Sequence, residues 1–146
     1  PRNFGAIVRT ANTVGVHGII VPKHRSAPAN QLVAKAAAGA LAYTSVCRVQ
    51  NLVSVIEQLK KEGIWVVGTA EDAGQSLYAF DFNLDLALVI GSEGKGMHSL
   101  VRHHCDFLIS IPSRGEIPSL NASVAAAVVL YEAIRQRHYN KSFTSK

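Results

Sequence analysis

The sequence has little cysteine and no long apolar run. Its two cysteines, Cys47 and Cys105, stand far apart and outside any CxxC pair, which argues against a disulfide framework or a zinc ribbon. No apolar stretch approaches the roughly 18 residues that a membrane-spanning helix requires, and no charged and then apolar leader opens the sequence. We therefore expect a cytoplasmic protein that neither spans a membrane nor depends on a metal.

Charged residues are also sparse, at 17% of the 146 residues, whereas 48% are hydrophobic. This balance argues against a largely disordered chain and favours one globular domain with a well-buried interior. Lysine and arginine exceed aspartate and glutamate by 15 to 10, which gives a formal charge of +5. Such an excess weakly favours a polyanionic partner such as nucleic acid.

Short β-branched runs alternate along the sequence with longer segments of helical spacing. Each run is nearly continuous in apolar residues, which is typical of parallel strands covered on both faces. The expected class is therefore α/β, a mostly parallel sheet flanked by helices. The predicted strands are 18–22, 45–49, 64–70, 86–91 and 107–112, and the predicted helices are 3–14, 30–41, 52–61, 97–104 and 119–137.

The last predicted helix has the clearest pattern. Ser119 fits its N-cap, and Arg135 and Arg137 suit the negative C-terminal end of its dipole better than a contact with RNA. Its apolar positions recur at steps of three and four residues, namely Leu120, Val124, Val128, Tyr131 and Ile134.

The first helical pattern opens at Asn3 without a preceding strand, although an α/β unit normally feeds such a helix from one. We therefore expect an N-terminal truncation. Residues 1–138 are predicted to form one catalytic domain, and the polar residues 139–146 a tail that frays.

Three short signatures contain the candidate functional residues. The first, over 3–11, has Asn3 and Arg9 two helical turns apart, and neither residue is needed for an apolar face. Taken singly, such an Asn is ordinarily an N-cap and such an Arg a solvated charge.

The second signature, over 88–97, is a buried strand that ends in three glycines around Glu93. Loops at the carboxyl ends of strands are where α/β sheets bind ligands, and glycines let backbone amides approach a nucleotide or a nucleoside-like cofactor. The spacing is neither that of a P-loop nor GxGxxG. A plain strand-to-helix turn is the structural alternative.

The third signature joins the strand at 109–112 to the start of the last helix, where Ser119 and Asn121 precede a run of alanines. Small residues there leave room for a flat ligand, or permit tight helix packing.

Together, these signatures resemble motifs one, two and three of the SpoU (TrmH-type) branch of the SPOUT, or α/β-knot, RNA methyltransferases. They occur in that order, and the resemblance runs from Asn3 to about Arg137. The stretches 21–28 and 68–70 look most like the bacterial 23S ribosomal RNA guanosine 2′-O-methyltransferases.

This resemblance implies a deep C-terminal trefoil knot over about 68–121 and a pocket for S-adenosylmethionine. It also implies a homodimer that methylates a ribose 2′-hydroxyl in RNA, most simply a guanosine of 23S RNA, with Arg9 of one subunit serving the cofactor of the other. The implied pocket residues are Thr69, Gly91, Ile111 and Leu120. The implied catalytic set is Arg9, Asn3, Glu93, Ser119 and Asn121.

Alternatives stay open at this point. The substrate could be transfer RNA, or the chain could be an RNA-binding member of the fold that has lost its chemistry. A dinucleotide-dependent oxidoreductase ranks below these because no phosphate fingerprint is present. The neighbouring residues His98, His103, His104 and Cys105 lack zinc-ligand spacing and are predicted to lie on a helix surface. Glu71 and Asp72 follow a strand end, where loop solvation is the simpler interpretation than a cofactor contact.

Overall fold

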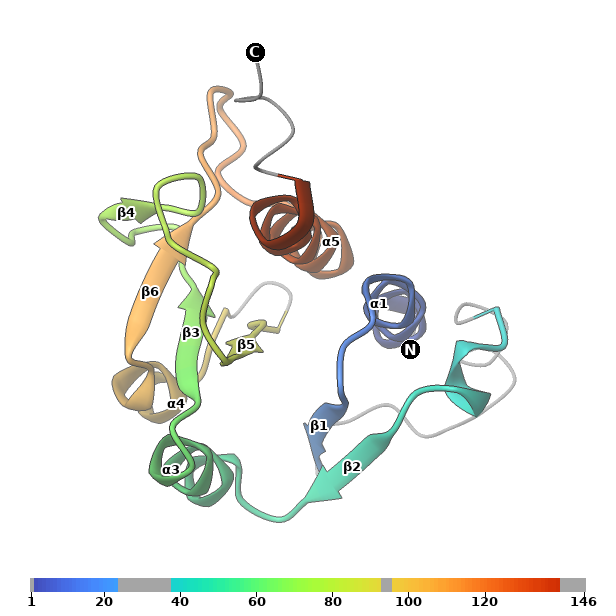
Figure 1. Cartoon of the computed structure of the whole chain (residues 1–146). Helices are drawn as coiled ribbons and strands as arrows, with labels where there is room; N and C mark the ends of the chain where they lie inside the picture. The colour runs from blue at the N-terminus through green and yellow to red at the C-terminus, as the bar shows by residue number, and fades with distance from the viewer. Residues whose placement is uncertain (1, 24–37, 93–95, 140–146) are drawn as a thin grey trace. The chain divides into compact units, whose positions relative to one another are not determined.

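The computed structural model describes residues 2–23, 38–92 and 96–139 and divides into two compact units, Pro1–Leu52 and Val53–Lys146. We call them unit 1 and unit 2. Each unit has its own parallel sheet (Figure 1). Among the helices of the described ranges, none combines the length and the apolar character that crossing a membrane demands.

Unit 1 is built from the helix α1 (Arg2–Val14) and the parallel strands β1 (Ile19–Pro22) and β2 (Val46–Val49), with a short 3-10 helix, η1 (Ala40–Ala42), before β2. The helix is amphipathic: buried Val8 packs on Ala40, and Phe4, Ile19 and Leu41 surround this contact. Asn3 lies inside the first turn of α1, so it does not cap the helix. Most of the helix predicted over 30–41 lies outside the described residues.

Unit 2 contains a four-stranded parallel sheet in the order β4-β6-β3-β5. The strand β6 therefore enters between two strands that precede it in the sequence. The strands are β3 (Trp65–Thr69), β4 (Gln75–Ser76), β5 (Leu86–Val89) and β6 (Phe107–Ser110), and the helices are α3 (Leu52–Lys61), α4 (Ser99–His104), α5 (Ala122–Ile134) and the π-helical turn η2 (Arg135–Tyr139). The strand β4 was not predicted, because two residues are too few to show a pattern.

The two faces of this sheet are buried by different elements. On one face, fully buried Val67 and Ile109 pack against Val129 of α5, together with the aromatic pair Phe80 and Phe82, whose ring centroids lie 4.8 Å apart. On the other face lies Gly68. A Cβ there would stand 2.5 Å from Met97 Cε and 2.9 Å from Cys105 Sγ, so the segment around α4 packs directly on the β3 backbone.

The start of α5 differs from the prediction. Asn121, and not Ser119, is the N-cap: its Oδ1 accepts hydrogen bonds from Ser123 N (3.0 Å) and Ser123 Oγ (2.6 Å). Asn caps a helix as well as Ser does, and the captured amide fixes the first helical residue as Ala122. The two arginines at the far end make side-chain contacts that the sequence did not indicate.

Arg135 is the C-cap residue of α5, at the end where the sequence placed it. Arg135 pairs with buried Glu132 at 2.7 Å, and Arg137 donates from Nε to Phe82 O at 2.9 Å and from Nη2 to Leu84 O. Gln136 Nε2 donates to Phe80 O (2.9 Å), while its Oε1 accepts from Phe82 N (2.8 Å). We call Gln136 and Arg137 the C-terminal latch, because together they hold residues 80–84.

Replacing Gln136 with alanine should destabilise the protein by about 1–3 kcal/mol, because two half-buried backbone groups lose their partner at once. Urea unfolding followed by circular dichroism measures this. Exposed Gln58 of α3 is the matched control, and its replacement with alanine should change stability by less than about 0.5 kcal/mol. Equal stability of the Gln136 and Gln58 variants would show that the hydrogen bonds of Gln136 contribute nothing.

Candidate functional site

Three of the four predicted pocket residues gather at one edge of the unit 2 sheet. Thr69 ends β3, Gly91 lies two residues beyond β5, and Ile111 directly follows β6. Because β3 pairs in parallel with both β5 and β6, the carboxyl ends of the three strands meet at this edge. The carboxyl edge of a parallel sheet is where α/β proteins bind ligands.

The glycine loop after β5 closes back on itself. Ser92 and Gly96 form an antiparallel bridge with N···O distances of 3.0 and 2.9 Å, and Ser92 Oγ also donates to Gly96 O. Gly96 adopts a φ of +67°, in the left-handed region that glycine tolerates best. The loop therefore places its returning backbone directly over Gly91.

Gly91 has no room for a side chain. A Cβ built there would lie 2.7 Å from both Gly96 C and Met97 N, closer than real atoms approach. Both obstacles are backbone atoms, so they cannot swing away as a flexible side chain would. The glycine is thus required for the loop to reach its folded geometry.

The remaining predicted residues of unit 2 stand differently. Glu93 lies outside the described residues. Ser119 is exposed and precedes α5 without capping it, whereas Asn121 uses its Oδ1 as the cap. Leu120, the fourth predicted pocket residue, lies between them, and 48% of its side chain surface is exposed.

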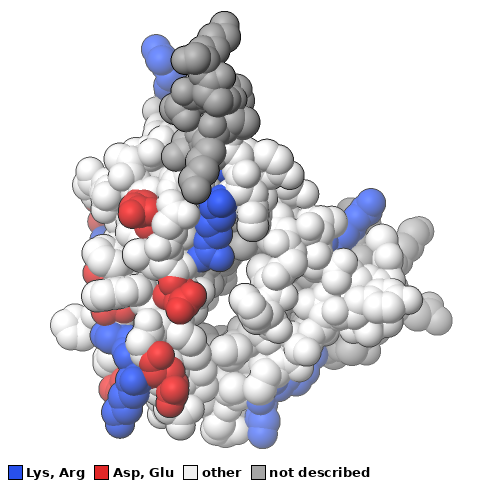
Figure 2. Space-filling view, in the orientation of Figure 1, with Lys and Arg blue, Asp and Glu red and all other residues white. Residues whose placement is uncertain are grey.

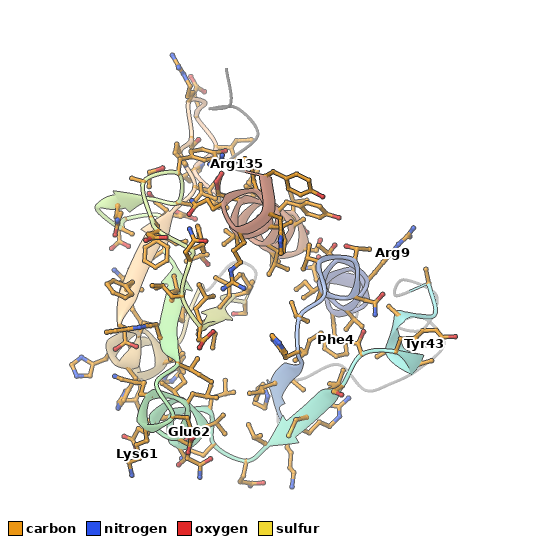
Figure 3. All side chains as sticks on the ribbon, viewed as in Figure 1. Phe4, Arg9, Tyr43, Lys61, Glu62 and Arg135 are labelled. Carbon is orange, nitrogen blue, oxygen red and sulfur yellow. The ribbon has the colours of Figure 1, made fainter. Side chains whose placement is uncertain are left out.

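Arg9 and Asn3 both lie on α1 of unit 1. Figure 3 labels Arg9 on this helix. Arg9 is exposed, because it falls outside the face that carries Phe4 and Val8, and Asn3 is half-buried with an interaction of its own. The structure thus places these two residues on one helix, as predicted, and the pocket residues in the other unit.

One residue pair near the strand ends was missed by the sequence interpretation. Asp72, on the loop after β3, forms a bidentate pair with Arg102 of α4, with contacts of 2.9 and 3.1 Å. The hydrogen bond from Arg102 lowers the pKa of the Asp72 carboxyl, so this tie weakens only as the pH falls through that lowered pKa. Asp72 is therefore held to α4 rather than merely solvated. Asp72 and Arg102 are 30 positions apart, so no local sequence pattern indicates that they pair.

The histidines around α4 have structural partners. His98 caps this helix by accepting from Leu100 N, and His104 contacts Leu100 O at 2.8 Å and Glu57 at 3.5 Å. Burial raises the pKa of the neighbouring Cys105 thiol, which keeps it neutral. In the described parts of the chain, no three metal-ligating side chains come together.

A surface hollow of about 420 Å³ lies on α3, the helix whose carboxyl end leads into the amino end of β3. It is therefore at the opposite edge of the sheet from the three strand ends. Its lining is Val55, Gln58, Leu59, Lys61 and Glu62, a set with no residue from the signatures.

The chain resembles known proteins over most of its length. The model of the SpoU rRNA Methylase family matches residues 1–131. A Bacillus subtilis protein named within the TrmH family of tRNA/rRNA methyltransferases, YacO, is 51% identical over 138 residues, which cover 94% of this chain and 55% of YacO. The chain thus spans about half the length of the curated relatives it matches.

Solved structures show the same likeness to SpoU and TrmH proteins. The SpoU methyltransferase AviRb from Streptomyces viridochromogenes, in complex with the cofactor AdoMet, superposes with a TM-score of 0.88 at 35% identity, over 94% of this chain and 56% of AviRb. A TrmH/SpoU tRNA modifying enzyme from A. aeolicus gives 0.85 at 32% identity, over 93% and 69% of the two chains. These likenesses confirm the predicted fold class, α/β with the SPOUT knot.

Proposed function

Because this chain belongs to the SpoU rRNA Methylase family, we propose that it transfers a methyl group from S-adenosylmethionine to a ribose 2′-hydroxyl in RNA. The observation that carries the proposal is the meeting of Thr69, Gly91 and Ile111 at the carboxyl edge of one parallel sheet, beneath a closed glycine loop. AviRb, which shares this fold, has been solved with AdoMet.

The residues at this edge suit such a cofactor. Backbone amides and carbonyls of the strand ends and the glycine loop can bind its polar groups, and the half-buried side chain of Ile111 offers an apolar contact for a flat base. Leu120 would add a second apolar contact from the start of α5. When bound, the cofactor supplies the methyl group from its sulfonium.

In this proposal Arg9 binds phosphate and stabilises the alkoxide that forms on the ribose as the 2′-hydroxyl releases its proton to water. An arginine side chain stays protonated in proteins, so it is poorly suited to act as a literal base. Asn3, Glu93, Ser119 and Asn121 would organise the ribose, the phosphate and the glycine loop. Arg9 of one subunit would act on the cofactor bound by the other subunit of a dimer.

We further propose a guanosine of 23S ribosomal RNA as the target in the cytoplasm, with transfer RNA as the second candidate because YacO and the A. aeolicus protein bear names that include tRNA. Mapping 2′-O-methyl marks over both RNAs after deletion of the gene separates the two. Loss of one 23S mark supports the first target, and loss of a transfer RNA mark supports the second. An unchanged map would favour a noncatalytic RNA-binding protein.

A homodimer is part of the same proposal. The helix α5 has apolar residues at both buried and exposed positions: Ala126 and Val129 are buried, yet Val124 and Tyr131 are 48% and 52% exposed, and Leu120 precedes the helix. An apolar strip of this kind on an exposed helix face is typical of an interface between subunits.

Replacing Val124 with aspartate should convert the dimer to a monomer in analytical ultracentrifugation, because a carboxylate would be buried without a partner. Leu100 of α4 is the matched control, since it is 51% exposed but lies on another helix, and its replacement with aspartate should leave the dimer intact. A wild-type monomer at working concentration would contradict the assembly.

A further inference from the structure

The net positive charge of the chain lies in unit 1. Residues 1–52 contain six lysines and arginines and neither aspartate nor glutamate, so unit 1 has a formal charge of +6. Residues 53–146 contain nine basic and ten acidic residues, a formal charge of −1. Figure 2 shows the same division, with acidic side chains only over unit 2. The chain-wide charge of +5 thus comes from unit 1, whereas unit 2 is close to neutral.

Three of these cations are described and exposed: Arg9 on α1, Lys23 after β1 and Arg48 on β2. The sequence of unit 1 contains neither aspartate nor glutamate beside these cations. Exposed cations bind the phosphates of a nucleic acid whatever its base sequence, because binding releases the counterions condensed on the nucleic acid.

Unit 1 also displays an aromatic ring that contributes nothing to the core. Tyr43 is 85% exposed, more than Tyr78 of unit 2 at 61%. Trp65, by contrast, is 46% exposed and packs on Phe107, with ring centroids 5.5 Å apart. The backbone of Tyr43 is nevertheless held, because its N–H closes η1 on Ala40 O at 3.0 Å.

The ring is presented on the flank of α1 that carries Arg9. Asn12 Nδ2 donates to Thr44 Oγ1 at 3.2 Å, which ties the residue next to Tyr43 to α1. Arg9 lies one turn before Asn12, and residues at i and i+3 share a helix flank. In Figure 3 the Arg9 and Tyr43 side chains both extend outward on the same side of unit 1.

We propose that Tyr43 stacks on an unpaired base of the RNA substrate and thereby positions the chain whose phosphates Arg9 contacts. This inference rests on the proposed function, and it assigns unit 1 as the surface that holds single-stranded RNA. Exposed tyrosines beside cations bind single strands because every base has a π-face, whereas the bases of a duplex are stacked on one another and not available.

The test measures binding of a fluorescein-labelled single-stranded RNA by anisotropy over a range of NaCl concentrations. Tyr43→Ala should weaken binding by roughly 5- to 100-fold without changing the dependence on salt, because stacking releases no counterions. Tyr43→Phe keeps the ring and should bind as wild type does. Arg9→Ala should reduce the slope of log K against log salt by about one.

Tyr78→Ala is the matched control, since Tyr78 is an exposed tyrosine in the acidic unit, and it should bind as wild type does. A duplex of the same sequence should bind equally to wild type and to Tyr43→Ala. Circular dichroism checks that each variant folds. Tyr43→Ala should fold as wild type does, because the tyrosine side chain is almost fully exposed.

Equal binding of single-stranded RNA by wild type and Tyr43→Ala would overturn the inference and leave the proposed function standing. An equal loss in Tyr43→Ala and Tyr43→Phe would indicate the hydroxyl and also overturn stacking. A changed sedimentation coefficient with unchanged RNA affinity would assign Tyr43 to a contact between copies of the chain instead. Wild-type protein that binds no RNA would overturn the inference and the proposed function together.

Discussion

Replacing Gly91 with alanine should abolish S-adenosylmethionine binding in isothermal titration calorimetry. The new methyl group would stand 2.7 Å from backbone atoms of Gly96 and Met97, so the closed glycine loop must open to admit it. Opening breaks the Ser92–Gly96 bridge and moves the amides that would bind the cofactor. Alanine at position 91 is therefore expected to abolish cofactor binding as a larger residue such as valine would.

The matched control is Gly74→Ala. A Cβ at Gly74 meets nothing within 4 Å, and the residue lies on a loop of the same unit. This variant should bind the cofactor as wild type does, which separates the crowding at Gly91 from a general effect of replacing glycine. Wild-type affinity in Gly91→Ala would contradict the proposed pocket.

Replacing Arg9 with alanine should lower kcat for methyl transfer by roughly 100- to 1000-fold, the usual cost of removing one group that stabilises developing charge. The Kd for S-adenosylmethionine should stay unchanged, because Arg9 lies on α1 and the proposed pocket is built from unit 2. Single-turnover transfer to RNA at saturating cofactor, together with calorimetry, measures the two quantities separately.

Arg9→Lys keeps the charge but loses the planar fork, so it should recover only part of the rate. Lys61 of α3 is an exposed cation outside the signatures, and Lys61→Ala should leave kcat unchanged. An equal loss of cofactor binding and methyl transfer in Arg9→Ala would indicate that the arginine serves the structure instead.

The strands were predictable because their burial leaves a continuous apolar run. All five predicted strands occur, and β3 and β6 end within two residues of the predicted bounds. The N-cap of α5 was not predictable, because Ser119 and Asn121 are both good caps and only the local backbone decides between them. The C-terminal latch joins residues more than 50 positions apart, a distance over which periodicity carries no information.

The candidate site also contains residues that the sequence predicts and contacts that it does not. Thr69, Gly91 and Ile111 could be found from the sequence, because the rule that ligands bind at carboxyl ends of parallel strands needs only the strand positions. The tie between Asp72 and Arg102 needed the tertiary fold. Tyr43 had no motif around it, and its exposure became visible only once Ala40 and Leu41 were seen to pack against α1.

The order of the unit 2 strands has a consequence for how the protein is made on the ribosome. The strand β4 pairs only with β6 in this sheet, so it has no neighbour until residue 110 has been synthesised. Residues 80–84 then wait for Gln136 and Arg137. A nascent chain paused before residue 137 would therefore expose Phe80 and Phe82 to chaperones and proteases, while unit 1 could already have folded.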